Sequence, residues 1–512
     1  MDKLKRLLPV AALVGLCALI FALRLHTYNE PLERDLTTYA VIAHEMLEGK
    51  SLYSDLWDHK PPAIHVTYAA AELVAGYGRN SIFLMNVVAS IATLLACYSI
   101  GSAGGAGRFG GLTAAAVWTL VSGDLAIEGN QPNTEVFLNA CLTTAFAIFV
   151  RSGGKGSILG FRSALVAGLL FGVASLYKQI AIVHPVLLGA VYVMSAPSGV
   201  RKRAFVGVSL IGAIGLVLWG LVLGYFAVRG HAGAFIDAVF NYNRWYSANG
   251  GQNSLVRPSN VMAPDVFTVI VCIGSLALSG MVLGLVFGPR RQWNLLIAFA
   301  IATEIAVLLP GGFFQHYYQL WLPPLAIGAG WTVSLLRRIL PVSARWLAQV
   351  TSVVSLLTLA FIEAPCYRDS ATIWSFKKYG VIFLETDKLA RSIDNLLLPN
   401  ETFYEWGNET GLYFTSRRRP PSGIIFAYPT QDGPLASQLS RRLLDDLKQT
   451  QPELIVLSRK ALERVGEAGP ILAWSTEEYR PFSDTGLFLL FVRKGSRLDT
   501  QGITFANGPA YF

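Results

Sequence analysis

The feature that most constrains the fold is a series of apolar runs, each about 16–22 residues long, in the first two thirds of the chain. A helix needs roughly 20 apolar residues to cross the hydrocarbon core of a bilayer. The chain has 512 residues, 53% hydrophobic and 15% charged, whereas a soluble domain has about 25% charged residues. The sequence therefore predicts a polytopic α-helical membrane protein.

The net charge of +9 follows membrane topology and does not indicate a nucleic-acid surface. From Glu363 onward the basic and acidic residues are equal in number, so the whole excess lies in the membrane part. There it gathers in short loops, as expected for loops on the cytoplasmic side. The loops predicted to be inner ones contain Arg108, Arg151 with Lys155, Arg201–Arg203, Arg290 with Arg291, and Arg337 with Arg338.

These inner loops, together with Lys3, Lys5 and Arg6, predict an inner N-terminus and about eleven crossings. The segment 61–78 would reverse the side of every later loop if it also crossed. We therefore expect it to form a juxtamembrane helix on the outer face. The predicted crossings are 7–25, 81–100, 109–127, 133–150, 163–177, 179–195, 204–228, 264–287, 294–309, 317–335 and 346–362.

The first outer loop, residues 33–78, holds the most polar stretch between apolar segments. Apolar residues recur at three- and four-residue spacing over 35–49, and Gly49 is a suitable helix end. This pattern predicts an amphipathic helix that lies in the membrane interface. Asp35 begins that helix, where an acid serves either as a helix cap or as a general base.

Two lysines are candidates for binding a phosphate at the outer surface. Lys60 precedes Pro61 and Pro62, which restrict the backbone, although a lysine at this depth can also simply extend to the headgroups. Lys178 lies between two apolar half-segments, where an ionisable residue is costly and therefore a functional candidate. Its alternative role is to cap a helical hairpin in water. Together the two could hold a lipid phosphate or pyrophosphate.

Further polar groups of the outer loops are weaker candidates. Asp55 lies near an expected turn, where a solvated acid is the simpler interpretation. Glu128 belongs to a second outer cluster, and His316 and Tyr317 belong to a third. A histidine near a helix end is as readily a structural residue as a ligand.

No compact metal-ligand spacing or nucleotide motif occurs in the sequence. The histidines and acids of the first outer loop do not match the spacing of known metal sites. There is no phosphate-binding G-x-x-x-x-G-K-[ST] loop and no G-x-S-x-G motif. The sequence therefore requires no cofactor, and it neither supports nor excludes a divalent cation.

Residues 363–512 differ in character from the rest. Short β-rich runs alternate with helical segments and with turns rich in glycine and proline, which predicts a small α/β domain. The expected strands are 402–407, 411–416, 423–429, 452–458 and 486–493, and the clearest helix is Ala436–Gln449.

A family resemblance is carried by the first outer loop. The run Asp35-x3-Tyr39, Met46-Leu47-x-Gly49, Tyr53-x-Asp55 and Lys60-Pro61-Pro62 resembles that loop in the GT-C membrane glycosyltransferases. It is most similar to the branch that contains the protein O-mannosyltransferases and the aminoarabinose transferase of lipid A. The turn at Lys178 and the segment 315–324 are similar to that branch too. The resemblance covers roughly residues 1–362, expected to be the transmembrane catalytic module, and leaves 363–512 as an extracytoplasmic domain.

The resemblance implies that Asp35 is the catalytic base. Many family members have a second acid directly after the first, whereas this chain has Leu36 there. We therefore consider Asp55 and Glu128 as partner acids. The residues expected to bind substrate are Tyr39, Lys60, Lys178, His316 and Tyr317.

The implied activity is transfer of a hexose or pentose from a polyprenyl-phosphate donor to an envelope lipid, glycan or protein. It would take place on the periplasmic (extracytoplasmic) face of the bacterial inner membrane. One alternative is a transporter or a flippase of lipid-linked sugars, for which Glu304 is the main intramembrane acid. Another is a non-catalytic assembly factor that binds a partner through residues 370–512. The sequence names neither the sugar nor the acceptor.

Overall fold

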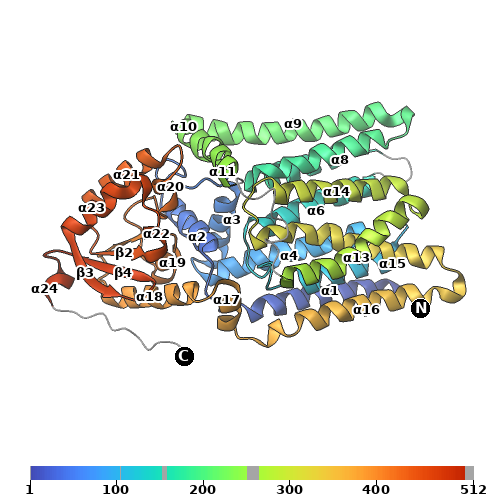
Figure 1. Cartoon of the computed structure of the whole chain (residues 1–512). Helices are drawn as coiled ribbons and strands as arrows, with labels where there is room; N and C mark the ends of the chain where they lie inside the picture. Colours follow the sequence, from blue (N-terminus) through green and yellow to red (C-terminus); the bar gives the residue numbers. More distant parts are fainter. Residues whose placement is uncertain (1, 104, 153–157, 251–263, 502–512) are drawn as a thin grey trace.

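The computed structural model describes residues 2–103, 105–152, 158–250 and 264–501. These residues form a helix bundle, a smaller body around a β-sheet, and a layer of short helices and loops between the two (Figure 1). Lys155, predicted to lie in an inner loop, and residues 502–512, the end of the predicted C-terminal domain, lie outside the described residues.

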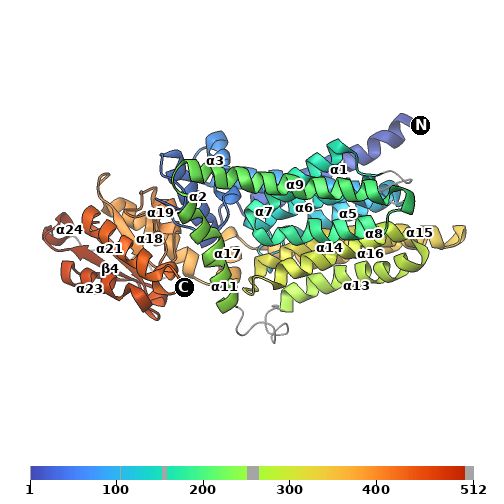
Figure 2. The same cartoon turned by 90° about the horizontal axis from the view of Figure 1, so that it is seen from above.

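Eleven helices of the described residues pack side by side in the bundle (Figures 1 and 2). This agrees with the number of crossings predicted from the basic loops. They are α1 (Asp2–His26), α4 (Arg79–Gly101), α5 (Gly107–Val121), α6 (Thr134–Ser152), α7 (Phe161–Tyr177), α8 (Val183–Met194), α9 (Ser198–Val228), α13 (Pro264–Phe287), α14 (Arg290–Leu308), α15 (Leu322–Ile339) and α16 (Trp346–Glu363).

Seven of the described helices are long and apolar enough to cross a membrane on their own. The remaining bundle helices are α5, α7, α8 and α15. Three of them are only 12 to 17 residues long, and α15 has Arg337 and Arg338 in its last turn. They pack against longer neighbours, as α5 does against α4 and α15. Helix α15 begins five residues later than predicted, because the 3-10 turn η4 (Gln315–Trp321) precedes its two prolines.

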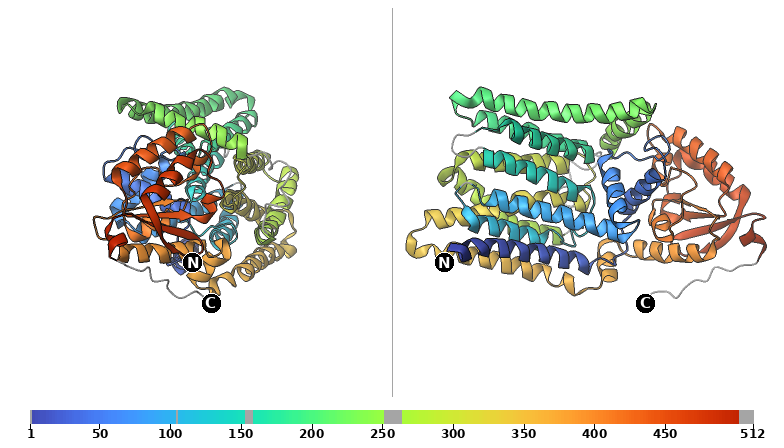
Figure 3. Two further views of the ribbon diagram at one scale, coloured as in Figure 1. Left: turned by 60° about the vertical axis from the view of Figure 1, so that its left-hand side comes forward. Right: turned by 180° about the vertical axis from the view of Figure 1, so that it is seen from behind.

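The outer loop places two helices across one end of the bundle, α2 (Arg34–Leu47) and α3 (Ala63–Ala75) (Figure 3). With 13 residues, α3 is about 20 Å long, shorter than the roughly 30 Å hydrocarbon core. It packs on α2, α4 and α7. This length and position agree with the juxtamembrane placement predicted for residues 61–78.

The expectation that α2 lies in the membrane interface is wrong. Nine of its 14 residues are buried, including Leu36, Thr37 and Thr38. The hydroxyls of Thr37 and Thr38 lie 2.8 and 2.9 Å from that of Thr410, so the C-terminal body covers the face that amphipathic patterning assigns to water. Gly49, with a φ of 95°, lies just beyond the end of the helix, close to where the sequence predicted it.

The C-terminal body contains a four-stranded mixed sheet in the order β1-β2-β4-β3. Strands β1 (Phe403–Trp406) and β2 (Leu454–Ser458) are parallel, and β4 (Phe488–Arg493) runs antiparallel to both β2 and β3 (Tyr479–Asp484). The helices of this body are α17 (Ala371–Tyr379), α18 (Ile382–Leu396), α19 (Gly411–Ser416), α20 (Tyr428–Gln431), α21 (Ala436–Thr450), α22 (Arg459–Leu462), α23 (Gly469–Glu478) and α24 (Arg497–Thr500).

Three of the predicted strands are present and two are not. Residues 411–416 form helix α19 and 423–429 form no strand, while β3 was not predicted. The aromatic composition of 411–416 favours a strand, but here it serves packing: the ring of Tyr413 stacks on Phe403 at 4.7 Å. Its hydroxyl also accepts a hydrogen bond from the backbone N–H of Glu405. Tertiary contacts thus override β-propensity.

The C-terminal body is attached directly to the outer loop. The N–H of Trp57 donates to the carbonyl of Gly423, and the backbone of Asp55 passes so close that a Cβ at Gly423 would lie 1.8 Å from its oxygen. A buried ion pair joins Lys378 to Glu30 at 2.5 Å. These contacts hold the sheet against the loop that carries half of the predicted site residues.

Candidate active site

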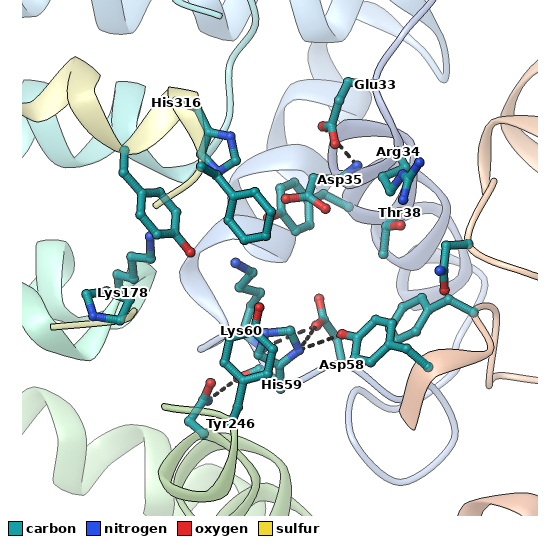
Figure 4. Close-up of a pocket in the computed structure, with 18 of the residues that line it drawn as sticks. Glu33, Arg34, Asp35, Thr38, Asp58, His59, Lys60, Lys178, Tyr246 and His316 are labelled. Atoms are coloured by element: carbon teal, nitrogen blue, oxygen red, sulfur yellow. Dashed lines mark hydrogen bonds and ion pairs between the residues drawn. The ribbon is translucent and has the colours of Figure 1, made fainter. Parts of the chain in front are cut away.

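A cavity of about 930 Å³ lies where the end of the bundle meets the C-terminal body. Figure 4 shows side chains from the outer loop, from the turn at Lys178 and from η4 directed toward this space. The cavity brings together all but one of the predicted site residues. Those that line it are Asp35, Tyr39, Lys60, Glu128, Lys178, His316 and Tyr317.

Asp35 is held at the first turn of α2 by hydrogen bonds on both sides. Glu33 caps the helix, and its Oε2 accepts from the backbone N–H of Asp35 at 2.9 Å. The side-chain amide of Asn133 donates to Oδ2 of Asp35 at 3.3 Å, while its oxygen accepts from the hydroxyl of Tyr39. The carboxyl group of Asp35 faces the cavity (Figure 4). Since Glu33 supplies the cap, the Asp35 carboxylate is available for chemistry.

Glu33 is an acid partner that the sequence argument missed. It is buried, and burial together with the charges of Asp35 and Glu128 raises its pKa well above the ordinary value. A carboxyl group in this position keeps its proton at a pH at which an ordinary carboxylate has lost it. Position 36, where the family pattern has its second acid, holds a buried leucine. The buried acid beside Asp35 in this chain thus precedes it by two residues.

Lys60 directs its ammonium group into the cavity (Figure 4). Its backbone is anchored by the hydroxyl of Tyr53, which donates to the Lys60 carbonyl at 2.7 Å, and by Asp58, which accepts from its N–H. Burial lowers the pKa of Lys60, but Asp35, Tyr317 and Glu135 together outweigh that effect and the pKa is raised. Within the described residues its ammonium has no ion pair, so it is a cation available to a ligand.

Asp58 and two histidines support the loop beneath Lys60. Oδ2 of Asp58 lies 3.0 Å from Nε2 of His65, and Oδ1 lies 3.4 Å from Nδ1 of His59. Burial raises the pKa of Asp58, but the hydrogen bond from His65 and the nearby positive charges lower it to about 2. Burial lowers the pKa of His59 to about 4, so this ring is neutral near pH 7.

Lys178 and Glu135 form a buried ion pair at 2.6 Å. The ammonium group also lies 3.5 Å from the centre of the Tyr317 ring. Glu135 is completely buried at the start of α6, and Lys178 occupies the extended residue between α7 and the turn η2 (Gln179–Ile182). The lysine is therefore held rigidly at the cavity wall, with its charge balanced by Glu135.

His316 pairs with Glu128 at 3.1 Å. Burial lowers the pKa of His316, but the hydrogen bond to Glu128 and the charges of the nearby acids together outweigh it, and the pKa is raised. Glu128 has a φ of 57°, in the left-handed region that few residues other than glycine adopt. The side-chain amide of Gln319 donates to the Glu128 carbonyl at 3.2 Å and holds this conformation. Such strain is common at functional sites.

Asp55 is not brought to the site. It is exposed in the turn before Lys60, where its carboxylate accepts from the N–H of Ser51 at 2.7 Å. The Asp55 carbonyl contacts Arg442 and Gly423 of the C-terminal body. Its structure is that of a turn-stabilising acid, the simpler of the two interpretations that the sequence left open.

The remaining wall of the cavity comes from residues that the sequence did not single out. Arg244 and Tyr246 belong to α11 (Asn243–Gly250), which is tied to the outer loop because Asn243 donates to the carbonyl of His59. The C-terminal body contributes the residues Lys378, Tyr379, Asn408, Glu409, Phe426, Tyr428, Ser458, Arg459 and Lys460. Across the described ranges, no cluster of three or more His, Cys, Asp or Glu side chains is arranged to hold a metal ion.

No protein-family model matches the sequence, and no curated protein matches it either. Several solved structures do share its fold. ArnT from Cupriavidus metallidurans bound to undecaprenyl phosphate has a TM-score of 0.65 at 15% identity, over 95% of this chain and 98% of that one. In its apo state the same protein has a TM-score of 0.62.

Two larger proteins are also similar in structure. The archaeal oligosaccharyltransferase AglB from Archaeoglobus fulgidus, in complex with an inhibitory peptide and a dolichol-phosphate, has a TM-score of 0.53 at 13% identity. The match covers 97% of this chain and 75% of that one. The arabinofuranosyltransferase AftD from Mycobacteria has a TM-score of 0.54 at 11% identity over 96% of this chain, which spans 40% of AftD. The chain is therefore a multi-pass membrane protein with the fold of the GT-C membrane glycosyltransferases.

Proposed function

We propose that this protein transfers a sugar from a polyprenyl-phosphate donor to an acceptor of the cell envelope. The observation that carries the proposal is that Asp35 and Lys60 face the same cavity. The carboxylate of Asp35 can accept a proton there, and the ammonium group of Lys60 has no ion pair in the described structure. The GT-C fold supports a transferase over a transporter, and Glu304, the acid that favoured a transporter, does not line the cavity.

The proposed reaction is a single displacement with inversion at the anomeric carbon. Asp35 accepts the proton of the acceptor hydroxyl or amine as that atom forms its bond to the sugar. The bond between the anomeric carbon and the donor phosphate oxygen breaks, and the electron pair leaves with the lipid phosphate. A positioned general base of this kind contributes about 10²–10⁴-fold to the rate.

The lysines serve the leaving group in this scheme. Lys60 binds the phosphate and neutralises the charge that develops on it, an electrostatic contribution that is strong in a site with little water. Lys178 adds a second positive charge whose position is set by Glu135. Arg244, which lines the same cavity, supplies a third cation from α11. Tyr39, His316 and Tyr317 shape the walls around the transferred sugar.

The proposed location is the extracytoplasmic face of a bacterial inner membrane. The basic N-terminus favours the cytoplasm, and it lies at the end of the bundle opposite the cavity (Figure 1). Residues 1–362 would form the transmembrane catalytic module and 363–512 a domain that closes the cavity from outside. The bound lipid phosphates of ArnT and AglB support a lipid-linked donor.

Reconstituted protein separates this proposal from a flippase. Liposomes that contain the protein, a labelled polyprenyl-phosphate sugar and no acceptor would retain the label in its original leaflet if the protein is a transferase. Movement of the label across the bilayer, equal in the wild type and in Asp35→Asn, would contradict the proposal and support transport.

A further inference from the structure

The C-terminal sheet presents a second group of polar side chains to the cavity. Strands β1 and β2 are parallel, so their carboxyl ends meet at one edge of the sheet. Asn408 and Glu409 follow β1, and Arg459 and Lys460 follow β2; all four line the cavity. The edge at the carboxyl ends of parallel strands is where ligands commonly bind in α/β folds.

Two oxygen atoms at this edge have no hydrogen-bond donor. Glu409 is 4% exposed, and its Oε1 binds Arg34 at 2.9 Å, but its buried Oε2 has no partner within the described residues. Oδ1 of Asn408 is also buried and lacks a partner there. Buried oxygens are rarely left unpaired in native proteins, and each exception calls for an explanation. Both residues line the cavity, so these oxygens lie beside the space that a bound molecule would occupy.

Both acids at this edge already have a cationic partner. Arg34 neutralises Glu409, and Arg459 pairs with Asp484 at 2.5 Å. Lys460 faces the Glu409 carboxyl and lowers its pKa in opposition to burial, which raises it more strongly. The unpaired oxygens at this edge therefore call for hydrogen-bond donors, and a neutral hydroxyl supplies a donor without adding a charge. The cations suited to a phosphate, Lys60 and Lys178, belong to the bundle side.

Aromatic rings lie on the same wall. Phe426 and Tyr428 stack on one another with ring centres 4.9 Å apart and planes 6° apart, and both line the cavity. The Tyr428 hydroxyl is held by His59, 2.8 Å from its Nδ1. Rigid aromatic faces beside unpaired oxygen acceptors match a sugar, which has apolar C–H faces and a rim of hydroxyl donors.

We propose that this edge is the acceptor subsite and that it binds the saccharide part of an uncharged, hydroxyl-rich glycan. Hydroxyls of the acceptor donate to Oε2 of Glu409 and Oδ1 of Asn408, and a sugar ring packs on Phe426 and Tyr428. The inference rests on the proposed transferase function, because it assigns the acceptor of that same site.

Binding of defined probes to the full-length protein in nanodiscs tests the subsite. The probes are neutral hexose and pentose oligosaccharides, the same oligosaccharides bearing a phosphate, and an uncharged peptide, each followed by saturation-transfer NMR. Neutral oligosaccharides should bind better than both other classes. Tighter binding of the phosphorylated probes or of the peptide, or no binding of neutral oligosaccharides, would overturn the assignment.

Two variants with matched controls locate the binding. Asn408→Ala and Glu409→Ala should each weaken neutral-oligosaccharide binding by about three- to tenfold, the worth of one hydrogen bond. Asn395→Ala and Glu463→Ala, both at exposed positions outside the cavity, should leave it unchanged. Glu409→Ala also leaves Arg34 unpaired, so if that variant unfolds, Asn408→Ala decides. Equal binding by Asn408→Ala and Asn395→Ala would contradict the proposal.

A separate readout keeps this inference distinct from the transferase proposal. Native mass spectrometry with undecaprenyl phosphate reports the donor side of the cavity. Asn408→Ala should bind this lipid as the wild type does, and Lys60→Ala should not. Failure of the acceptor subsite would appear as unchanged oligosaccharide binding in Asn408→Ala, whereas failure of the transferase proposal would appear as intact sugar transfer in Asp35→Asn.

Discussion

Asn133 donates a hydrogen bond to the carboxylate of Asp35 across 98 positions of the chain. The same amide accepts from the hydroxyl of Tyr39, so a single residue at the start of α6 orients two side chains of α2. Asn133 is 3% exposed, so water cannot readily take over its hydrogen bonds to Asp35 and Tyr39. The bundle thereby sets the direction of the proposed base.

Replacement of Asn133 by alanine should reduce kcat while donor affinity stays the same. A base that is misplaced by about 1 Å can lose roughly 10²-fold in rate. The measurement is steady-state transfer together with undecaprenyl phosphate binding, with the exposed Asn395→Ala as control. Weaker lipid binding with an unchanged kcat would contradict this prediction, because Asn133 would then support the donor site and not the orientation of Asp35.

Lys60→Ala should abolish binding of the lipid phosphate, and Lys60→Arg should retain part of it, because arginine keeps the charge but not the shape of the ammonium group. Lys448 is exposed on α21, so Lys448→Ala is the matched control for loss of one positive charge. Native mass spectrometry with undecaprenyl phosphate gives the result directly. Equal binding by Lys60→Ala and Lys448→Ala would remove Lys60 from the donor site.

The pair of Lys178 and Glu135 should show strong coupling. Removing one partner of a buried ion pair typically costs about 3–5 kcal/mol, because the other charge is left uncompensated. Glu135→Gln and Lys178→Met should therefore each lower Tm, and the double variant should recover most of the loss while remaining inactive. Additive losses of Tm in the double variant would show that the two residues do not act as a pair.

The pair of His316 and Glu128 should make stability depend on pH. The pKa of His316 is raised in the folded protein, so the pair stabilises fully below pH 6.5 and this contribution is lost as the pH rises through the raised pKa. The Tm of the wild type should fall more than that of Glu128→Gln between pH 6.5 and 9. Parallel Tm curves for the two proteins would contradict the assignment.

The sequence predicted the bundle well because apolar length and basic loops are local signals. Lys178 could also be identified, since it is an ionisable residue between two apolar half-segments, whereas Asp35 and Lys60 were identified from the pattern of the outer loop and its family resemblance. Asp55 remained a possible partner acid in the sequence, and the turn geometry around Ser51 shows that it is a structural acid.

Long-range packing accounts for what the sequence could not supply. The face of α2 that looked suited to a membrane surface is covered by Thr410, which lies more than 370 positions away in the chain. Glu33 is recognisable as the partner acid only once its burial beside Asp35 is known. Asn408 and Glu409 reach the cavity because a parallel strand pair ends there, and no local pattern marks that edge.

The central claim, that Asp35 is the base of a lipid-dependent sugar transfer, is tested most directly in a strain whose only copy carries Asp35→Asn. Mass spectrometry would follow both the polyprenyl-phosphate sugars and the envelope glycans, with the variant's level and Tm compared with the wild type. We predict a normally folded protein, an accumulated polyprenyl-phosphate sugar that identifies the donor, and an envelope glycan lacking that sugar. Normal envelope glycosylation without accumulation of the donor would contradict the account.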